Sequence, residues 1–394
     1  MIPQRKRATG LRMQEQFIDK PAQLETFAAA VRRAEWLAVD TEFIRERTYF
    51  PRLCLIQVAS EEIAACIDPL RLEDLSPLRE LLLDPSIIKV FHAARQDMEI
   101  FLHLWNALPA PLFDTQPAAA LLGIGDQIGY GTLIQQVLQV NLPKDHSRTD
   151  WSRRPLQKEQ TRYALDDVIY LGRAYLKMGR QLAELGRLEW LQSEFEQLTD
   201  PGTYVLEPME MWRRVKGRQY LKGTRLAVLQ QLAAWREEQA LERDLPRRWI
   251  LKDDVLLEIA RRTPRTLQEL SRIRGVESAF VRNNGEALLY RVRQGLEAPR
   301  EQWPVEKSRP DKLSSDEEAA LDILGGALRL IAEKADLSPQ VIASRKDLAA
   351  LLKGDEQARL LKGWRREVAG EPLQKLLQGE YCISLANGIP ELQK

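Results

Sequence analysis

The segment that decides the fold is WLAVDTEF, residues 36–43. Its apolar, partly β-branched character predicts a buried strand, and Asp40 and Glu42 stand two residues apart within it. Alternate side chains of a strand leave the same face, so both carboxylates are expected on one face of a sheet. Two carboxylates in one site raise each other's pKa unless a cation neutralises them, and oxygen ligands suit Mg²⁺ or Mn²⁺. The alternative is that Asp40 ends the strand and Glu42 already faces solvent.

Short apolar strands and helical patterns alternate around this segment. The expected strands are 36–43, 53–59, 63–67 and 87–91, and the expected helices are 69–83, 98–105, 116–122, 131–140 and 158–188. This alternation is typical of a mixed sheet covered by helices. The sequence therefore predicts one α/β domain over residues 1–200.

Beyond residue 200 the strand pattern stops, and apolar residues recur at helical spacing. Residues 298–316 are rich in Pro, Lys, Glu, Ser and Asp, so they are the predicted linker. Two all-helical modules are expected, at 201–297 and 317–394. Each contains a glycine turn before a final apolar helix, but this weak echo leaves open whether the modules are copies.

Two further acids and a tyrosine stand out in the α/β half. Asp97 follows the strand expected at 87–91, where open α/β sheets bind ligands, although an acid in the first turn of a helix is also ordinary. Tyr163 and Asp167 are four residues apart and share one helix face. A carboxylate there can hold a metal while the phenol hydrogen-bonds an attacking water. Composition does not choose between Asp166 and Asp167.

Composition bounds the class of protein. The chain has 394 residues, 44% hydrophobic and 29% charged, with a formal net charge of +1. These values are typical of a globular protein with two or three domains. The sequence contains neither an apolar run of the ~18 residues that span a bilayer nor a leader pattern, so a soluble, cytoplasmic protein is expected. The cysteines and histidines lack the spacing of a disulfide framework or of a metal site. The sequence has no unused heptad pattern, so a monomer is expected.

Clusters of cations predict where nucleic acid binds. Residues 212–222 contain no acid and interleave aromatics with cations, a combination that can bind phosphates and stack bases. A second cluster, near the acids, can line the approach of a strand's 3′ end. The candidate contacts are Arg153, Arg154, Lys158, Arg213, Arg214, Lys216, Arg218, Tyr220 and Lys222, with Arg148 as a further one near the acids. The alternative for each cluster is a solvated helix face.

Taken in order, these segments resemble the DEDD exonuclease superfamily and, within its tyrosine-containing branch, the ribonuclease D family. The resemblance rests on Val39-Asp40-Thr41-Glu42-Phe43, Phe91-His92-Ala93-Ala94-Arg95-Gln96-Asp97, Tyr163 with Asp167, Phe113-Asp114-Thr115, Asp150-Trp151 and Arg154-Pro155-Leu156. It covers residues 20–190, implies a ribonuclease H-like exonuclease fold, and selects Asp167 over Asp166. Residues 246–292 resemble an HRDC domain. Residues 351–385 resemble a second, more divergent copy, which has no obvious counterpart of the turn that the first copy forms at 273–276.

The resemblance implies a 3′→5′ exoribonuclease that releases 5′-mononucleotides with two divalent ions, Mg²⁺ or Mn²⁺. By family pattern, Asp40 bridges both ions, Glu42 and Asp167 hold the first, Asp97 supports the second through water, and Tyr163 orients the nucleophile. The implied substrate is structured RNA with an unpaired 3′ tail, most plausibly a transfer-RNA precursor. Two alternatives are a DNA 3′→5′ exonuclease and a non-catalytic RNA-binding protein that has kept the fold.

Overall fold

The computed structural model describes residues 13–143, 149–306 and 313–393. Contacts divide these residues into two compact units. The first, here called the sheet unit, comprises 13–43, 53–203 and 313–393, and the second, the helical unit, comprises 44–52 and 204–306. The insert 44–52 thus belongs to the helical unit, although the chain on either side of it belongs to the sheet unit. Among the described residues, no helix has the length and apolar character needed to cross a bilayer.

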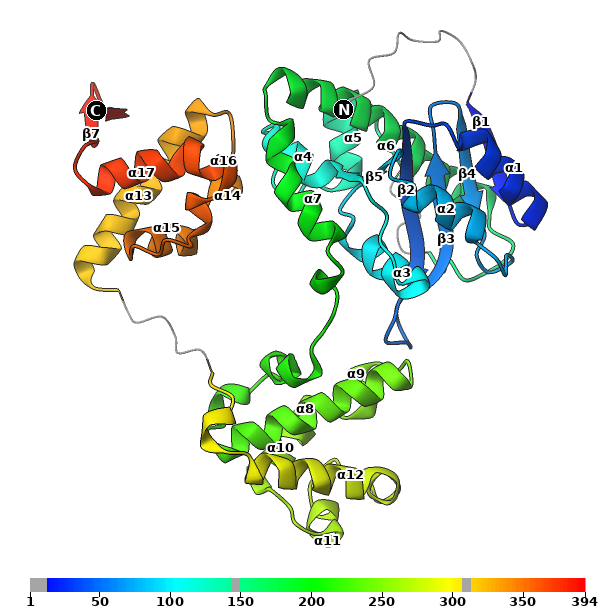
Figure 1. Ribbon diagram of the computed structural model, residues 1–394, viewed down its shortest axis with the longest axis vertical. Coiled ribbons are helices and arrows are strands. Elements are labelled where there is room, and N and C mark those ends of the chain that lie inside the picture. Colours follow the sequence, from blue (N-terminus) through cyan, green and yellow to red (C-terminus); the bar gives the residue numbers. More distant parts are fainter. Residues whose placement is uncertain (1–12, 144–148, 307–312, 394) are drawn as a thin grey trace. The chain divides into compact units, whose positions relative to one another are not determined.

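A six-stranded mixed sheet is the centre of the sheet unit (Figure 1). In spatial order its strands are β1 (Gln14–Ile18), β4 (Ile63–Ile67), β3 (Arg52–Ala59), β2 (Trp36–Ile44), β5 (Ile88–Phe91) and β6 (Leu112–Asp114). β2 runs parallel to β5, with Ala38 opposite Val90, and β5 runs parallel to β6. β4 pairs in parallel with β1 and antiparallel with β3. The predicted mixed sheet is confirmed.

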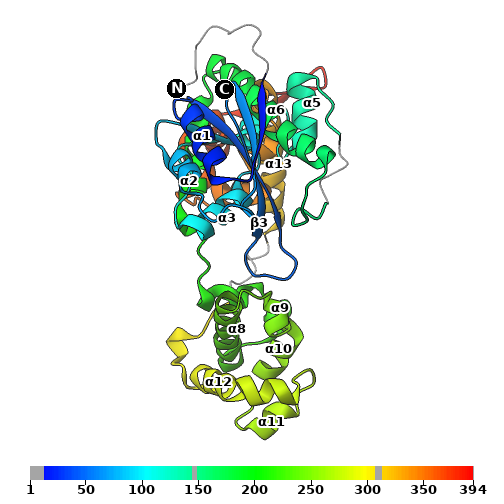
Figure 2. The same cartoon turned by 90° about the vertical axis from the view of Figure 1, so that its right-hand side faces the viewer.

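Helices cover both faces of the sheet. They are α1 (Pro21–Val31), α2 (Ser76–Leu83), α3 (Arg95–Trp105), α4 (Thr115–Leu121), α5 (Tyr130–Leu138), α6 (Lys158–Glu184) and α7 (Gln192–Thr199), with 3₁₀ turns η1 (Leu188–Leu191) and η2 (Pro201–Thr203). Figure 2 shows the sheet between α1, α2 and α3 on one side and α5 and α6 on the other. Helix α2 begins at Ser76, not at 69 as predicted, because Pro77 favours the first helical turn and Asp68 holds a separate turn by accepting from the Leu70 amide.

The 27-residue helix α6 brings the second half of the site to the sheet. It buries a continuous apolar stripe that includes Leu165, Val168 and Leu171. Gly172 lies in that stripe, directly against the indole of Trp36, the first residue of β2. Because Gly172 has no side chain, the helix backbone approaches this strand closely.

Residues 313–393 contact the helical segment around η1 and α7 of the sheet unit. Their helices are α13 (Ser315–Lys334), α14 (Pro339–Ile342), α15 (Arg345–Leu352), α16 (Gly363–Arg365) and α17 (Glu371–Leu377), with short turns η6 (Arg359–Leu361) and η7 (Arg366–Gly370). The indoles of Trp190 and Trp364 stack with 4.7 Å between ring centroids, and Arg365 pairs with Glu194 at 3.0 Å. Contacts therefore group this segment with the sheet unit.

The chain ends in a β-hairpin, so the prediction that residues 317–394 are all-helical is wrong. Strands β7 (Cys382–Ala386) and β8 (Ile389–Gln393) are antiparallel. Asn387 and Gly388 join them, both with positive φ. A two-residue Asn-Gly turn is the strongest short hairpin signal in a sequence. Residues 387–388 therefore indicate a hairpin, whereas the helical spacing of the preceding residues predicts a helical module.

The helical unit is built on two long helices. Its helices are α8 (Thr224–Glu242), α9 (Arg247–Ile250), α10 (Asp253–Arg262), α11 (Leu267–Ser271) and α12 (Ser278–Glu297), with 3₁₀ turns η3 (Pro208–Arg214), η4 (Arg218–Tyr220) and η5 (Arg300–Gln302). The predicted linker 298–316 is partly structured. Trp303 Nε1 donates to the Ala298 carbonyl at 2.9 Å, and Glu306 pairs with Arg218 at 2.9 Å. Residues 307–312 lie outside the described residues, and α13 already begins at Ser315.

Helices α13 to α15 repeat the order of α8 to α10. Four residues separate α8 from α9 (243–246) and α13 from α14 (335–338). Two residues separate α9 from α10 (251–252) and α14 from α15 (343–344). In each set a long helix is followed by a four-residue helix and then a medium one. This correspondence supports the hypothesis of a repeated module better than the sequence echo did.

Candidate active site

Three carboxylates from two elements lie together. One oxygen of each of Asp40, Glu42 and Asp167 lies within 4.8 Å of the others. Asp40 and Glu42 come from β2, and Asp167 comes from the first half of α6. The period of the strand and the close packing of α6 on β2 thus bring together acids that are far apart in the sequence.

The electrostatics of this cluster favour a bound cation. Burial raises the pKa of Asp40 to about 6. Burial, and then the charges of Asp40, Asp167 and Asp97, raise the pKa of Glu42 to about 10. The carboxylates cannot all be ionised at neutral pH unless a positive charge compensates them. An all-oxygen donor set with this charge fits Mg²⁺ or Mn²⁺.

Asp97 lies next to this cluster, in the first turn of α3. Its Oδ1 accepts a hydrogen bond from Thr41 Oγ1 at 2.5 Å, so the residue between the two β2 acids orients Asp97. Burial and the charge of Asp40 raise the pKa of Asp97 well above its usual value. Asp97 is therefore close enough to interact electrostatically with Asp40, although it is not one of the three clustered carboxylates.

Asp114 holds the loop that leads to Asp97, a role that the sequence analysis missed. Its carboxylate accepts from the amides of Ala93 at 2.9 Å and Ala94 at 2.8 Å. Ala93 has a φ of 58°, a conformation that a non-glycine residue adopts at a cost. Asp114 also caps α4 by accepting from Gln116. The segment containing Asp114 was noted only as a family-like feature, since its partners are about twenty residues away.

Tyr163 stands one turn before Asp167 on α6 and hydrogen-bonds its carboxylate. Its ring centroid lies 6.2 Å from that of Trp151. Burial, and then the charge of Asp167, raise the pKa of Tyr163, so the phenol keeps its proton at any working pH. A half-buried, neutral phenol at this position can hydrogen-bond a water held near the cluster.

Tyr130 is a second tyrosine at the site that the sequence analysis missed. Its hydroxyl donates to the backbone carbonyl of Asp167. His92 lies beside it, with 5.6 Å between ring centroids, and bonds Thr115 at 2.9 Å and the Ile128 carbonyl at 3.0 Å. Burial lowers the pKa of His92 to about 4, so the ring is neutral.

Comparisons with known proteins agree with this geometry. A family model described as a 3′-5′ exonuclease matches residues 16–183, and one described as an HRDC domain matches residues 225–292. The ribonuclease D of Bartonella henselae is 38% identical over 385 residues, which are 96% of this chain and 94% of that protein. The ribonuclease D of Jannaschia sp. is 42% identical over 369 residues, which are 92% of this chain and 95% of that protein. The chain belongs to the ribonuclease D family.

A solved structure of this family has the same fold. The crystal structure of Escherichia coli RNase D, described as an exoribonuclease involved in structured RNA processing, matches with a TM-score of 0.80 and 33% identity. The match covers 93% of this chain and 99% of that chain. This ribonuclease D family member is therefore a 3′→5′ exoribonuclease of a metal-dependent exonuclease family, as the sequence predicted. The predicted HRDC domain within 201–297 is also confirmed.

Among the cations predicted near the ribonuclease D site, Arg154 has a structural role. Its guanidinium binds Asp68 through two hydrogen bonds, of 2.5 and 2.8 Å, and donates to three backbone carbonyls. Asp68 is almost fully buried, so Arg154 neutralises it and is not available to RNA. Arg153 is well exposed and pairs with Asp150 at 3.1 Å. Arg148 lies outside the described residues.

Lys158 lines a cavity that Asp167 of the carboxylate cluster also lines. The cavity has a volume of about 420 Å³. It is lined by Leu142, Pro143, Lys158, Glu159, Arg162, Tyr163, Asp166 and Asp167. A space of this size, with apolar and cationic walls beside the reacting groups, suits a terminal nucleotide.

The cationic segment 212–222 lies at the surface of the helical unit, except for the buried side chains of Trp212, Val215 and Leu221. Trp212 is fully buried in the core, so it cannot stack on a base. Tyr220 is 78% exposed, and Arg214, Lys216 and Lys222 are exposed as well. Arg213 pairs with Glu210, and Arg218 pairs with Glu306. The cations without a carboxylate partner among the described residues are therefore the better candidates for phosphate contacts.

Proposed function

We propose that this enzyme hydrolyses RNA one 5′-mononucleotide at a time from the 3′ end, using two divalent ions. The observation that carries the proposal is the cluster of Asp40, Glu42 and Asp167 within 4.8 Å, with Tyr163 hydrogen-bonded to Asp167. Asp40, Glu42 and Asp167 would hold the metal, with Asp97 supporting a second ion through water. When bound, the ions activate a water and stabilise the leaving 3′-oxygen.

The chain's own residues then orient the reaction. Tyr163 keeps its proton and holds the attacking water by hydrogen bonding. Thr41 keeps Asp97 in place, and Tyr130 keeps the backbone of Asp167 in place. The cavity beside Lys158 and Tyr163 would receive the terminal nucleotide. In this proposal the four acids supply the negative charge that binds the metal ions, and the hydroxyls of Thr41 and Tyr130 hold two of those acids in place.

We propose transfer-RNA precursors with unpaired 3′ tails as the substrates. The support is the E. coli relative, which is described as processing structured RNA, together with the HRDC match and the exposed cations of the helical unit. We also propose that residues 317–393 are a second, divergent HRDC domain, because α13 to α15 repeat the spacing of α8 to α10. The enzyme is proposed to act as a monomer, and light scattering on the purified protein tests this.

The test is digestion of matched 5′-labelled RNA and DNA, each with a duplex stem and an unpaired 3′ tail, in Mg²⁺. Wild type should shorten the RNA stepwise, and Asp167→Asn should not. Addition of EDTA should stop the reaction, and chromatography of the products should find 5′-mononucleotides. Equal or faster shortening of DNA would favour the DNA exonuclease alternative. Shortening of neither strand in Mg²⁺ or Mn²⁺ would refute the proposed chemistry.

A further inference from the structure

The insert 44–52 contributes a side chain to the core of the helical unit. Tyr49 is 7% exposed and belongs to the same apolar cluster as Trp212, Leu232 and Leu256. Phe50 packs against that cluster as well. The core of the helical unit therefore contains a residue from the connection between two sheet strands, β2 and β3.

A buried polar network fixes the Tyr49 hydroxyl. It donates to Glu237 Oε1 and accepts from Arg247 Nη2 at 2.9 Å. Arg247 also binds both Glu237 oxygens, one of them at 2.6 Å, and its guanidinium lies over the Tyr49 ring. Glu237 has no exposed surface, so its charge needs these partners. Tyr49 thus completes the coordination of a buried ion pair inside the helical unit.

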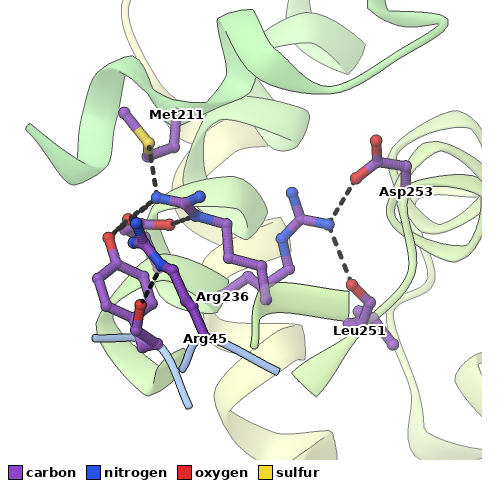
Figure 3. Close-up of polar contacts among 8 residues, drawn as sticks. Arg45, Met211, Arg236, Leu251 and Asp253 are labelled. Carbon is purple, nitrogen blue, oxygen red and sulfur yellow. Dashed lines mark hydrogen bonds and ion pairs between the residues drawn. The ribbon is translucent and has the colours of Figure 1, made fainter. Parts of the chain in front are cut away.

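The backbone of the insert is held too. Asp244 Oδ1 accepts hydrogen bonds from the amides of Tyr49 and Phe50, both at 3.0 Å. Within the insert, Arg45, labelled in Figure 3, donates from its Nε to the Tyr49 carbonyl at 3.1 Å. We call the contacts of Tyr49 and Phe50 with Asp244, Glu237 and Arg247 the anchor. The anchor is specific in both side chain and backbone, unlike the packing of an ordinary loop tip.

The anchor lies in the connection that follows the strand of the active-site acids. Strand β2 carries Asp40 and Glu42 and ends at Ile44, where the insert begins. The anchor lies at Tyr49 and Phe50, just before β3 begins at Arg52, so it lies in the short connection between two paired strands. The helical unit carries the HRDC match and the exposed cations that suit RNA.

We propose that Tyr49 is a positioning residue for structured RNA. It keeps the helical unit, which binds the folded part of the substrate, attached to the strand that bears the metal-binding acids. RNA long enough to contact both parts then gains affinity, whereas a short single strand does not. This inference rests on the exoribonuclease function proposed above, and it assigns the insert a role in substrate selection.

The kinetic test compares Tyr49→Phe and Asp244→Ala with wild type on two RNAs. One is a stem with an unpaired 3′ tail, and the other is a single-stranded tetranucleotide. Each variant should lower kcat/KM on the stem RNA about tenfold, mainly through KM, because the lost contacts are made before and during reaction alike. Activity on the tetranucleotide should stay within about twofold. Tyr175→Phe, the same change at a buried tyrosine of the sheet unit, is the matched control and should alter neither.

Hydrogen exchange tests the anchor itself without relying on activity. In wild type the amides of Tyr49 and Phe50 should exchange slowly, and Asp244→Ala should remove that protection. Fast exchange of both amides in folded wild type would overturn the proposal, as would an equal loss of activity on both RNAs. Protected amides in a protein that shortens neither RNA would instead show that the proposed chemistry, and not the anchor, is wrong.

Discussion

Gly172 of α6 and Trp36 of β2 approach each other so closely that a Cβ on Gly172 would lie 2.4 Å from two carbons of the indole ring. This contact sets the distance between the helix that carries Tyr163 and Asp167 and the strand that carries Asp40 and Glu42. The fully buried surroundings leave the indole little room to move.

Gly172→Ala is therefore expected to separate α6 from β2. We expect a loss of about 1–3 kcal/mol in the free energy of unfolding, together with a lower kcat, because overpacking displaces the metal-binding acids. Denaturant unfolding and RNA digestion measure the two effects. Gly131→Ala is the control, because nothing lies within 4 Å of a Cβ there, and it should be neutral or slightly stabilising. An unchanged unfolding free energy for Gly172→Ala would contradict the close contact.

Asp167→Asn is expected to abolish activity and to stabilise the metal-free protein. Burial and the charge of Asp40 raise the pKa of Asp167 well above its usual value, so its ionised form opposes folding at neutral pH. In EDTA the variant should be about 1–2 kcal/mol more stable than wild type, because one of the mutually repelling charges is gone. Mg²⁺ should then raise the melting temperature of wild type more than that of the variant. Equal Mg²⁺ stabilisation of both proteins would speak against Asp167 as a ligand.

Binding of Mg²⁺ is expected to release protons. In the metal-free protein the pKa of Glu42 is about 10, so this carboxyl is protonated at pH 7 and must ionise to bind the metal. At least one proton per protein, to order of magnitude, should leave at pH 7, because burial also raises the pKa of Asp97 and of Asp167. The Mg²⁺ affinity should rise with pH up to the pKa of Glu42. Calorimetry in two buffers of different ionisation enthalpy measures the release. Glu42→Gln should release less, and an enthalpy independent of the buffer would refute the prediction.

Arg154→Met is expected to destabilise the fold, whereas Arg153→Ala is not. Loss of Arg154 leaves the buried Asp68 carboxylate unpaired, which should cost about 3–5 kcal/mol of folding free energy. Loss of Arg153, whose side chain is 84% exposed, should leave stability within about 0.5 kcal/mol of wild type. If Arg153 contacts the substrate, its loss should raise KM for RNA and weaken the salt dependence of binding. Thermal unfolding and binding at several salt concentrations separate the two roles.

The local periods of the chain predicted much of the sheet and of the site. The four predicted strands agree with β2 to β5 within one residue at each end, because each is a short apolar run bounded by turn residues. β1 and β6 were not predicted, because β1 is a partly exposed strand at the edge of the sheet and β6 has only three residues, too few to show a period. The shared faces of Asp40 with Glu42 and of Tyr163 with Asp167 follow from spacings of two and four residues.

By itself, therefore, the sequence determined which side chains share a face and, through its motifs, which family the chain resembles. Only the tertiary structure decided what each long side chain contacts. Arg153 and Arg154 are adjacent in sequence, yet the side chain of Arg153 is exposed and that of Arg154 forms an ion pair with Asp68. The membership of Tyr49 in the helical core likewise depends on Glu237 and Arg247, nearly two hundred residues away. Periodicity reflects the geometry of one element, whereas these pairings depend on how the whole chain packs, which no local spacing encodes.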